Sequence, residues 1–207
     1  MRRLFVPGWA APAALYTPLL TRWEVQELPC FASGGRLETC VRHLVARLEA
    51  EGEPAIVGGH SMGAAIAVLA AVEHPELVDR LVLVNPAGLP LVKPMRMSAA
   101  DFVRQVRRGV YPTRVAVSAA GDILRAPRSA FRLARAVHGL DLTRELVELR
   151  TLGVRCQVIG CAGDTLTPAT HCRRLSALVG GSYRELNLAG GHMWMLYDRR
   201  AAASVLG

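Results

Sequence analysis

Residues 54–74 read PAIVGGHSMGAAIAVLAAVEH: a short apolar strand, a turn with a serine between glycines, and an almost wholly apolar helix. A helix that is apolar on every side must be buried on every side. A strand that leads straight into such a helix is typical of a parallel sheet with helices on both faces. This segment therefore predicts the α/β fold class.

The remaining chain follows the same rhythm of short β-like runs and helical patterns. Further strands are expected at 3–6, 23–28, 80–88, 154–164 and 182–192. The segment 90–152 breaks the rhythm, because it holds helical patterns and no strand-like run. We therefore predict a compact, mainly parallel sheet of about six strands flanked by helices and interrupted by one helical insertion. The expected parts are a first part of the core at 1–89, the insertion at 90–152, and a second part of the core at 153–207.

Length and cysteine content indicate a single domain in a reducing compartment. At 207 residues, two full domains are not expected. The five cysteines are an odd number and form no C-x-x-C pair, so we expect free thiols and a cytoplasmic location. Their spacing to the histidines matches no zinc site, and no metal is expected. Pro7 and Gly8 interrupt the apolar start, which argues against a signal peptide. No apolar run reaches the roughly 18 residues that span a bilayer, so no stable membrane insertion is expected.

The chain carries a formal net charge of +8, almost all of it from arginine. The basic residues are spread along the sequence without interleaved aromatic residues, so nucleic-acid binding is not expected. Two interpretations of the charge remain open. The arginines of the insertion could meet an acidic partner, or they could form ordinary solvated helix faces.

The turn between the apolar strand and the apolar helix has the chemistry of a nucleophile. G-H-S-M-G at residues 59–63 fits the G-x-S-x-G pattern in its required context of strand, sharp turn and helix. In this elbow, formed by Gly59, His60 and Gly63 around Ser61, the serine takes a strained backbone conformation. Larger flanking side chains would clash with the neighbouring strand and helix. Ser61 is therefore the predicted nucleophile.

A serine hydroxyl needs a base and an acid to become reactive. His192 follows LAGG at the end of the last expected strand, and Asp164 follows VIGCAG at the end of the preceding one. Asp164 could also cap the helix that follows it. The order Ser61, Asp164, His192 is the order of the nucleophile-elbow hydrolases. We predict His192 as the base and Asp164 as the acid.

An oxyanion hole needs two N–H donors near the nucleophile. One is the N–H of Met62, the residue after the nucleophile. The other should come from the loop after the first strand, VPGWA, where Gly8 permits a close backbone approach. We predict the N–H of Trp9 as the second donor.

These segments together resemble the α/β-hydrolase superfamily of serine esterases and lipases over nearly the whole chain. The matching pieces are PGW, ELPCF, GGHSMGAAIAVLAAVEHPELVDRLVLVNPAG, GDTLTP and AGGH. The resemblance implies an α/β-hydrolase fold with a helical lid inserted before the acid-bearing strand. Pro7 stands where the family usually has histidine, which leaves a backbone donor intact. ELPCFAS departs from the family turn D-x-P-G-x-G.

Ser61, Asp164 and His192 set a reaction class, namely cleavage of a carboxylic ester or thioester through an acyl-enzyme. The substrate is expected to be a small acyl ester. GW, LPCF and the arginine-rich insertion resemble the small carboxylesterases that cleave pimeloyl-carrier-protein methyl ester, which implies a carrier-bound acyl group as one option. No nucleotide or flavin motif occurs, so no cofactor is expected.

Two other classes of function stay open. The same scaffold serves lyases and cofactor-free haloperoxidases, because a fold does not determine a reaction. It could also serve as a ligand-binding or receptor-like protein that hydrolyses slowly. An intact set of nucleophile, acid and base favours hydrolysis. The sequence leaves the oligomeric state open.

Overall fold

The computed structural model describes residues 1–32, 34–50, 52–91 and 93–207. Within these residues one sheet has six strands, all parallel, in the order β2-β1-β3-β4-β5-β6. The strands are β1 (Arg3–Val6), β2 (Glu24–Val25), β3 (Ala55–His60), β4 (Val78–Val84), β5 (Arg155–Cys161) and β6 (Ser182–Leu186). The predicted fold class is confirmed.

Alternate side chains of each inner strand face opposite layers of helices. In β1, Leu4 and Val6 belong to one core cluster, and Phe5 belongs to the other. In β4, Leu83 and Val84 are divided in the same way. Because successive strand residues point to opposite faces, a strand between two helical layers must be apolar at every position.

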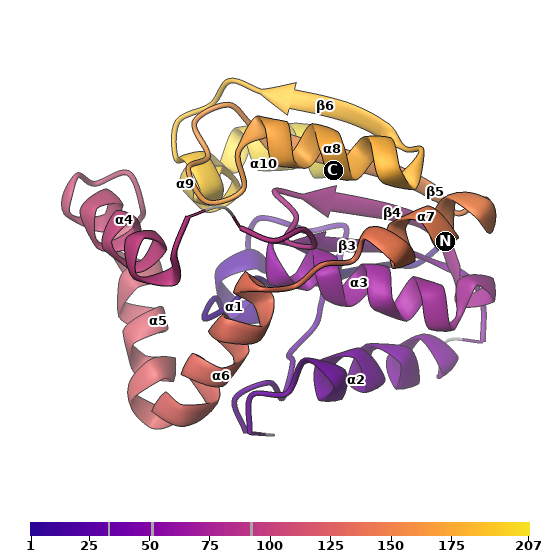
Figure 1. Cartoon of the computed structure of the whole chain (residues 1–207), viewed down its shortest axis with the longest axis horizontal. Helices are drawn as coiled ribbons and strands as arrows, with labels where there is room; N and C mark the ends of the chain where they lie inside the picture. The colour runs from indigo at the N-terminus through magenta and orange to yellow at the C-terminus, as the bar shows by residue number, and fades with distance from the viewer. Residues whose placement is uncertain (33, 51, 92) are drawn as a thin grey trace.

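The two faces of the sheet carry different helices (Figure 1). The first cluster receives α2 (Leu37–Glu49), α3 (Met62–Glu73), α7 (Thr143–Thr151) and α8 (Ala169–Val179). The second receives α1 (Ala13–Tyr16), α9 (Trp194–Tyr197) and α10 (Arg199–Leu206). Two short 3₁₀ turns lie at Pro75–Leu77 and Gly191–Met193, and only the second is buried. As predicted, α3 is buried on nearly all sides, with nine of its twelve residues buried.

Three helices of the insertion extend beyond these layers. They are α4 (Met95–Arg107), α5 (Thr113–Arg125) and α6 (Pro127–His138). Of these, α6 adds Leu133 and Val137 to the first cluster, and α5 adds Val115 to the second. Figure 1 shows them as a group beyond one end of the sheet, at the left of the view. None of the residues of α4 is buried. By contrast, α7 packs against α3 and α8, and so belongs with the helices that cover the sheet.

Two details differ from the sequence prediction. The strand expected at 23–28 is only two residues long, because the chain leaves the edge of the sheet after Gln26 donates to the carbonyl of Phe5. The expectation of five free thiols is wrong for Cys30 and Cys40, which form a disulfide. The loop before α2 returns Cys30 to the first turns of that helix, with the two Cα atoms 5.6 Å apart. An odd count of cysteines could not reveal this approach.

Candidate active site

Ser61 lies at the turn between β3 and α3 with φ 54° and ψ −116°. The glycines on either side of it are required by close backbone contacts. A Cβ atom on Gly59 would lie 2.4 Å from the carbonyl oxygen of Gly63, and one on Gly63 would lie 2.1 Å from the carbonyl oxygen of Val6. The turn is therefore as tight as its sequence predicts, with a strand on one side and the helix on the other.

Strained backbone gathers at this end of the sheet. Among the described residues, three non-glycine residues have positive φ: Ala10, Ser61 and Asn85. They follow β1, β3 and β4 respectively, so all three lie beyond the carboxyl ends of strands. Such conformations persist only where the surroundings hold them, and they concentrate at functional sites. The backbone thus points to this edge as the candidate site.

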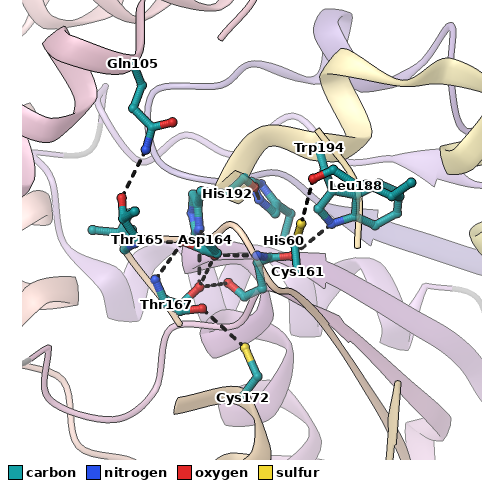
Figure 2. A network of polar contacts seen from close by, with 12 residues as sticks. His60, Gln105, Cys161, Asp164, Thr165, Thr167, Cys172, Leu188, His192 and Trp194 are labelled. Carbon is teal, nitrogen blue, oxygen red and sulfur yellow. Dashed lines mark hydrogen bonds and ion pairs between the residues drawn. The ribbon is translucent and has the colours of Figure 1, made fainter. Parts of the chain in front are cut away.

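Asp164 and His192 meet at the same edge. His192 Nδ1 lies 2.7 Å from Asp164 Oδ2, and the two residues are only 2% and 3% exposed. Figure 2 shows this contact at the centre of a network of polar side chains. The hydrogen-bond pattern assigns the imidazole proton to Nδ1, since a carboxylate only accepts. Nε2 is then left with a lone pair that can take a proton.

The two oxygens of Asp164 have different partners. Oδ1 accepts from the backbone N–H groups of Leu166 (2.7 Å) and Thr167 (2.9 Å). Oδ2 accepts from His192, from the Thr167 hydroxyl (2.7 Å) and from the Asn85 amide. Asp164 therefore does not cap the helix that follows it, because the N-cap of α8 is Pro168 and no side chain caps that helix. One oxygen of Asp164 holds the turn at Leu166 and Thr167, and the other contacts the histidine.

The environment of Asp164 keeps it ionised. Burial raises the pKa of its carboxyl group. The charge of His192 and the hydrogen bonds from His192, Asn85 and Thr167 outweigh this effect, so the pKa lies below its ordinary value. A buried carboxylate in this state is suited to stabilise a positive charge on the imidazole.

Ser61 is brought to the same edge but is not hydrogen-bonded to His192 within the described residues. Its neighbour His60 has a ring centroid 4.9 Å from that of His192. The side chain of His60 therefore lies beside the predicted base. It lies buried and contacts the backbone of His192. Proton transfer from Ser61 to His192 stays a prediction.

The predicted oxyanion donors lie at two different elements. Met62 begins α3, and the first N–H groups of a helix have no partner inside the helix. Trp9 follows Pro7 and Gly8 in the loop after β1, and its side chain contacts Phe31 with ring centroids 6.5 Å apart. The role of both N–H groups stays a prediction.

The helices α4, α5 and α6 are each joined to this edge of the molecule by a hydrogen bond that involves a side chain. Figure 2 shows the first of them, in which Gln105 approaches Thr165 beside Asp164. The bonds join Gln105 to the Thr165 hydroxyl (3.0 Å), Arg114 to the Leu196 carbonyl (2.8 Å), and the Trp9 indole to the Ala130 carbonyl (3.2 Å). The helices α4 and α6 thus touch the loops that carry Asp164 and Trp9, and α5 touches α9, the helix that follows His192.

Sequence reasoning missed three buried polar residues of the site: Tyr16, Asn85 and Thr167. Asn85 bridges two buried groups, since Trp194 Nε1 donates to its Oδ1 (2.9 Å) and its amide donates to Asp164. An asparagine directly after a buried strand could have been a signal, because asparagine tolerates positive φ. Nothing local marks Tyr16.

A surface hollow of about 450 Å³ lies elsewhere, on α4, lined by Ala100, Val103, Arg104, Arg107 and Arg108. The polar network locates the candidate site better than this hollow does, because the hollow contains none of the buried titratable groups. Among the residues that the structure describes, no three His, Cys, Asp or Glu side chains lie together in a way that could hold a metal ion. No described helix is long and apolar enough to cross a membrane.

Comparison with known proteins identifies the family of the chain. The sequence pattern of the Alpha/beta hydrolase family matches residues 4–204. A 2-hydroxymuconate semialdehyde hydrolase of Pseudomonas sp. (strain CF600) is 38% identical over 88 residues, which are 42% of this chain and 31% of that protein. This chain therefore aligns with less than a third of that relative's length.

Solved structures share the fold at low sequence identity. The enol-lactonase of Burkholderia xenovorans LB400 superimposes with a TM-score of 0.77 at 16% identity, over 99% of this chain and 89% of the other. The esterase EaEST of Exiguobacterium antarcticum has a TM-score of 0.77 at 14% identity, over 100% and 90%. At these identities the likeness concerns the fold alone.

Proposed function

Because the chain belongs to the alpha/beta hydrolase family, we propose that it cleaves carboxylic esters or thioesters through an acyl-enzyme. Ser61 is the nucleophile, His192 the base and Asp164 the acid. The observation that carries the proposal is the buried 2.7 Å contact between His192 and Asp164, at the sheet edge where Ser61 holds its strained turn. The relatives bear the names of a hydrolase, a lactonase and an esterase, which supports hydrolysis without selecting a substrate.

The proposed chemistry follows from the positions of these groups. His192 Nε2 takes the proton of the Ser61 hydroxyl while the serine oxygen bonds to the acyl carbon. The N–H groups of Trp9 and Met62 stabilise the negative oxygen of the tetrahedral intermediate. The imidazolium then gives its proton to the leaving alcohol or thiol. Water attacks the acyl-enzyme by the same route and releases the acid.

A fluorophosphonate probe tests the nucleophile. We expect covalent labelling of Ser61 in the wild type and none in Ser61→Ala. A series of p-nitrophenyl esters of increasing chain length then measures acyl preference. If the wild type shows no labelling and hydrolyses none of the esters above the rate of Ser61→Ala, the chain is a binding protein and the proposal is wrong. Labelling without ester turnover would instead point to another reaction on this scaffold.

A second part of the proposal concerns how the acyl group is presented. Residues 93–139 hold ten of the chain's 25 basic residues and two of its 17 acidic residues, so this segment accounts for the whole formal net charge of +8. An acidic carrier protein bearing the acyl group would be attracted to such a surface. The arginines Arg107 and Arg108 at the end of α4 are exposed and suit a test.

The test compares a carrier-bound acyl ester with the free p-nitrophenyl ester. We expect Arg107→Gln combined with Arg108→Gln to lower kcat/KM for the carrier-bound ester about tenfold, and 0.5 M salt to do the same, because surface attraction is screened. Arg42→Gln combined with Arg200→Gln, outside the segment, is the matched control. If both double variants lose kcat/KM for the carrier-bound ester equally, the proposed attraction of an acidic carrier is wrong. The proposed ester hydrolysis is not affected by that result.

A further inference from the structure

A chain of buried hydrogen bonds lies next to the candidate site. It includes the side chains of Tyr16 and His60, which have no role in the proposed mechanism. The N–H of Gly8 donates to the hydroxyl of Tyr16 (3.2 Å), and that hydroxyl lies 2.8 Å from His60 Nδ1. The other ring nitrogen of His60, Nε2, lies 2.9 Å from the carbonyl oxygen of His192. Tyr16 and His60 are 0% exposed.

The two ends of the chain determine where its protons lie. A backbone N–H such as that of Gly8 can only donate, and a carbonyl such as that of His192 can only accept. The His192 carbonyl therefore requires the imidazole proton of His60 on Nε2. Nδ1 is then an acceptor, and the Tyr16 hydroxyl donates its proton to it. Each polar group of Tyr16 and His60 then has a partner, and every hydrogen bond in the chain donates in the same direction, from the Gly8 N–H toward the His192 carbonyl.

Burial keeps this order intact. Burial, followed by the charge of His192, lowers the pKa of His60 to about 3, and burial raises the pKa of Tyr16. Neither side chain changes its charge near neutral pH. His60 is therefore unsuited to act as a base, although it adjoins Ser61 in sequence and contacts His192.

The chain connects two parts of the site that come from opposite ends of the sequence. At one end is Gly8, next to Trp9, whose N–H is the predicted oxyanion donor. At the other end is the backbone of His192, the predicted base. A Cβ atom on Gly8 would lie 2.9 Å from His60 Nδ1 and 3.4 Å from the Tyr16 hydroxyl, so the loop rests directly on the pair.

We propose that Tyr16 and His60 are positioning residues that set the distance between the oxyanion loop and the catalytic histidine. This inference rests on the proposed function. Displacements of about 1 Å at reacting groups lower rates by about a hundredfold, so a rigid link between donor and base serves the transition state. Packing alone would not require buried polar groups, because apolar side chains fill a core without desolvation cost.

The test is Tyr16→Phe, which keeps the ring and removes the hydroxyl. We expect kcat for a p-nitrophenyl ester to fall about 10- to 100-fold, with KM changed less than about threefold. Affinity for a phenylboronic acid, whose serine adduct is tetrahedral like the transition state, should fall by the same factor as kcat. Tyr183→Phe is the matched control, because that hydroxyl donates to Glu185 on β6, and it should leave both values unchanged.

A second variant guards against a Tyr16→Phe protein that does not fold. His60→Gln keeps an N–H donor for the His192 carbonyl, and we expect a loss in kcat of about three- to tenfold, smaller than that of Tyr16→Phe. Folding is checked by circular dichroism.

The proposal is overturned if a folded variant keeps the kcat and boronate affinity of the wild type, or if the loss lies only in KM or thermal stability. Positioning then fails while labelling of wild-type Ser61 by the fluorophosphonate still upholds the hydrolase. If the wild type is not labelled, both proposals fall.

Discussion

At the carboxyl edge of the sheet, Asp164 and His192 are almost fully buried, and their side chains are tied to each other and to Asn85 and Thr167. In the insertion, α4 has no buried residue, and Val117 and Leu124 of α5 are 67% and 79% exposed. The first region is held by the protein's own contacts, whereas the second presents charge and apolar surface outward. In the function that we propose, the edge carries out the reaction and the insertion governs what reaches it.

The largest expected effect separates the two regions by activity. Ser61→Ala and His192→Ala should each lower kcat/KM for a p-nitrophenyl ester at least about a hundredfold, because they remove the nucleophile or its base. Arg107→Gln in the insertion should change the same value by less than about threefold. Steady-state kinetics on the three variants checks the comparison. A loss in Arg107→Gln comparable to the other two would break it.

Replacing a glycine with alanine should change the stability of the protein in opposite directions in the two regions. Gly63→Ala should lower the free energy of unfolding by about 3 kcal/mol or more, because its Cβ would lie 2.1 Å from the Val6 carbonyl oxygen. Gly121→Ala in α5 should raise it by about 0.5 to 1 kcal/mol, since alanine favours a helix and its Cβ meets only the end of Arg125 at 3.7 Å. Urea unfolding measures both. The same sign for the two variants would contradict the contrast.

A smaller effect is expected from the amides of the two regions. Asn85→Ala should cost about 1 to 3 kcal/mol in the free energy of unfolding, because it leaves the buried Trp194 N–H without its acceptor. Gln105→Ala removes a bond at the surface of the insertion and should cost less than about 0.5 kcal/mol. Thermal and urea unfolding of both variants gives the comparison, and equal costs would show that Asn85 is not structurally special.

The smallest effect concerns pH. With a folded-state pKa of about 3 and an ordinary value of 6.5, His60 takes up a proton in the unfolded chain first. Its contribution to stability is therefore complete above pH 6.5 and is lost progressively as pH falls toward 3. His60→Gln should lack this pH-dependent contribution. The difference in the free energy of unfolding between this variant and the wild type should therefore become smaller as pH falls. A difference in the free energy of unfolding that stays constant between pH 7 and 4 would contradict this prediction.

Much of the fold and the outline of the site could be predicted without coordinates. The β-like runs predicted all six strands that the structure describes, and the four inner ones are largely apolar because helices cover both of their faces. The turn at Ser61 could be predicted because its glycines answer a local steric demand. Asp164 and His192 could be named because each follows a strand, and parallel strands end at one edge of a sheet. The edge strand β2 was overestimated, since its length depends on pairing and not on apolarity.

What the sequence determined by itself is thus whatever depends on near neighbours: strand and helix periodicity, the elbow around Ser61, and the order of the three predicted catalytic residues. Only the tertiary structure decided which distant groups meet. It joined Cys30 to Cys40, divided the oxygens of Asp164 between a turn and a histidine, and set Tyr16 against His60. Hydrogen bonds and disulfides act over a few ångströms, and the separation of their partners depends on how the elements pack, which no local pattern records.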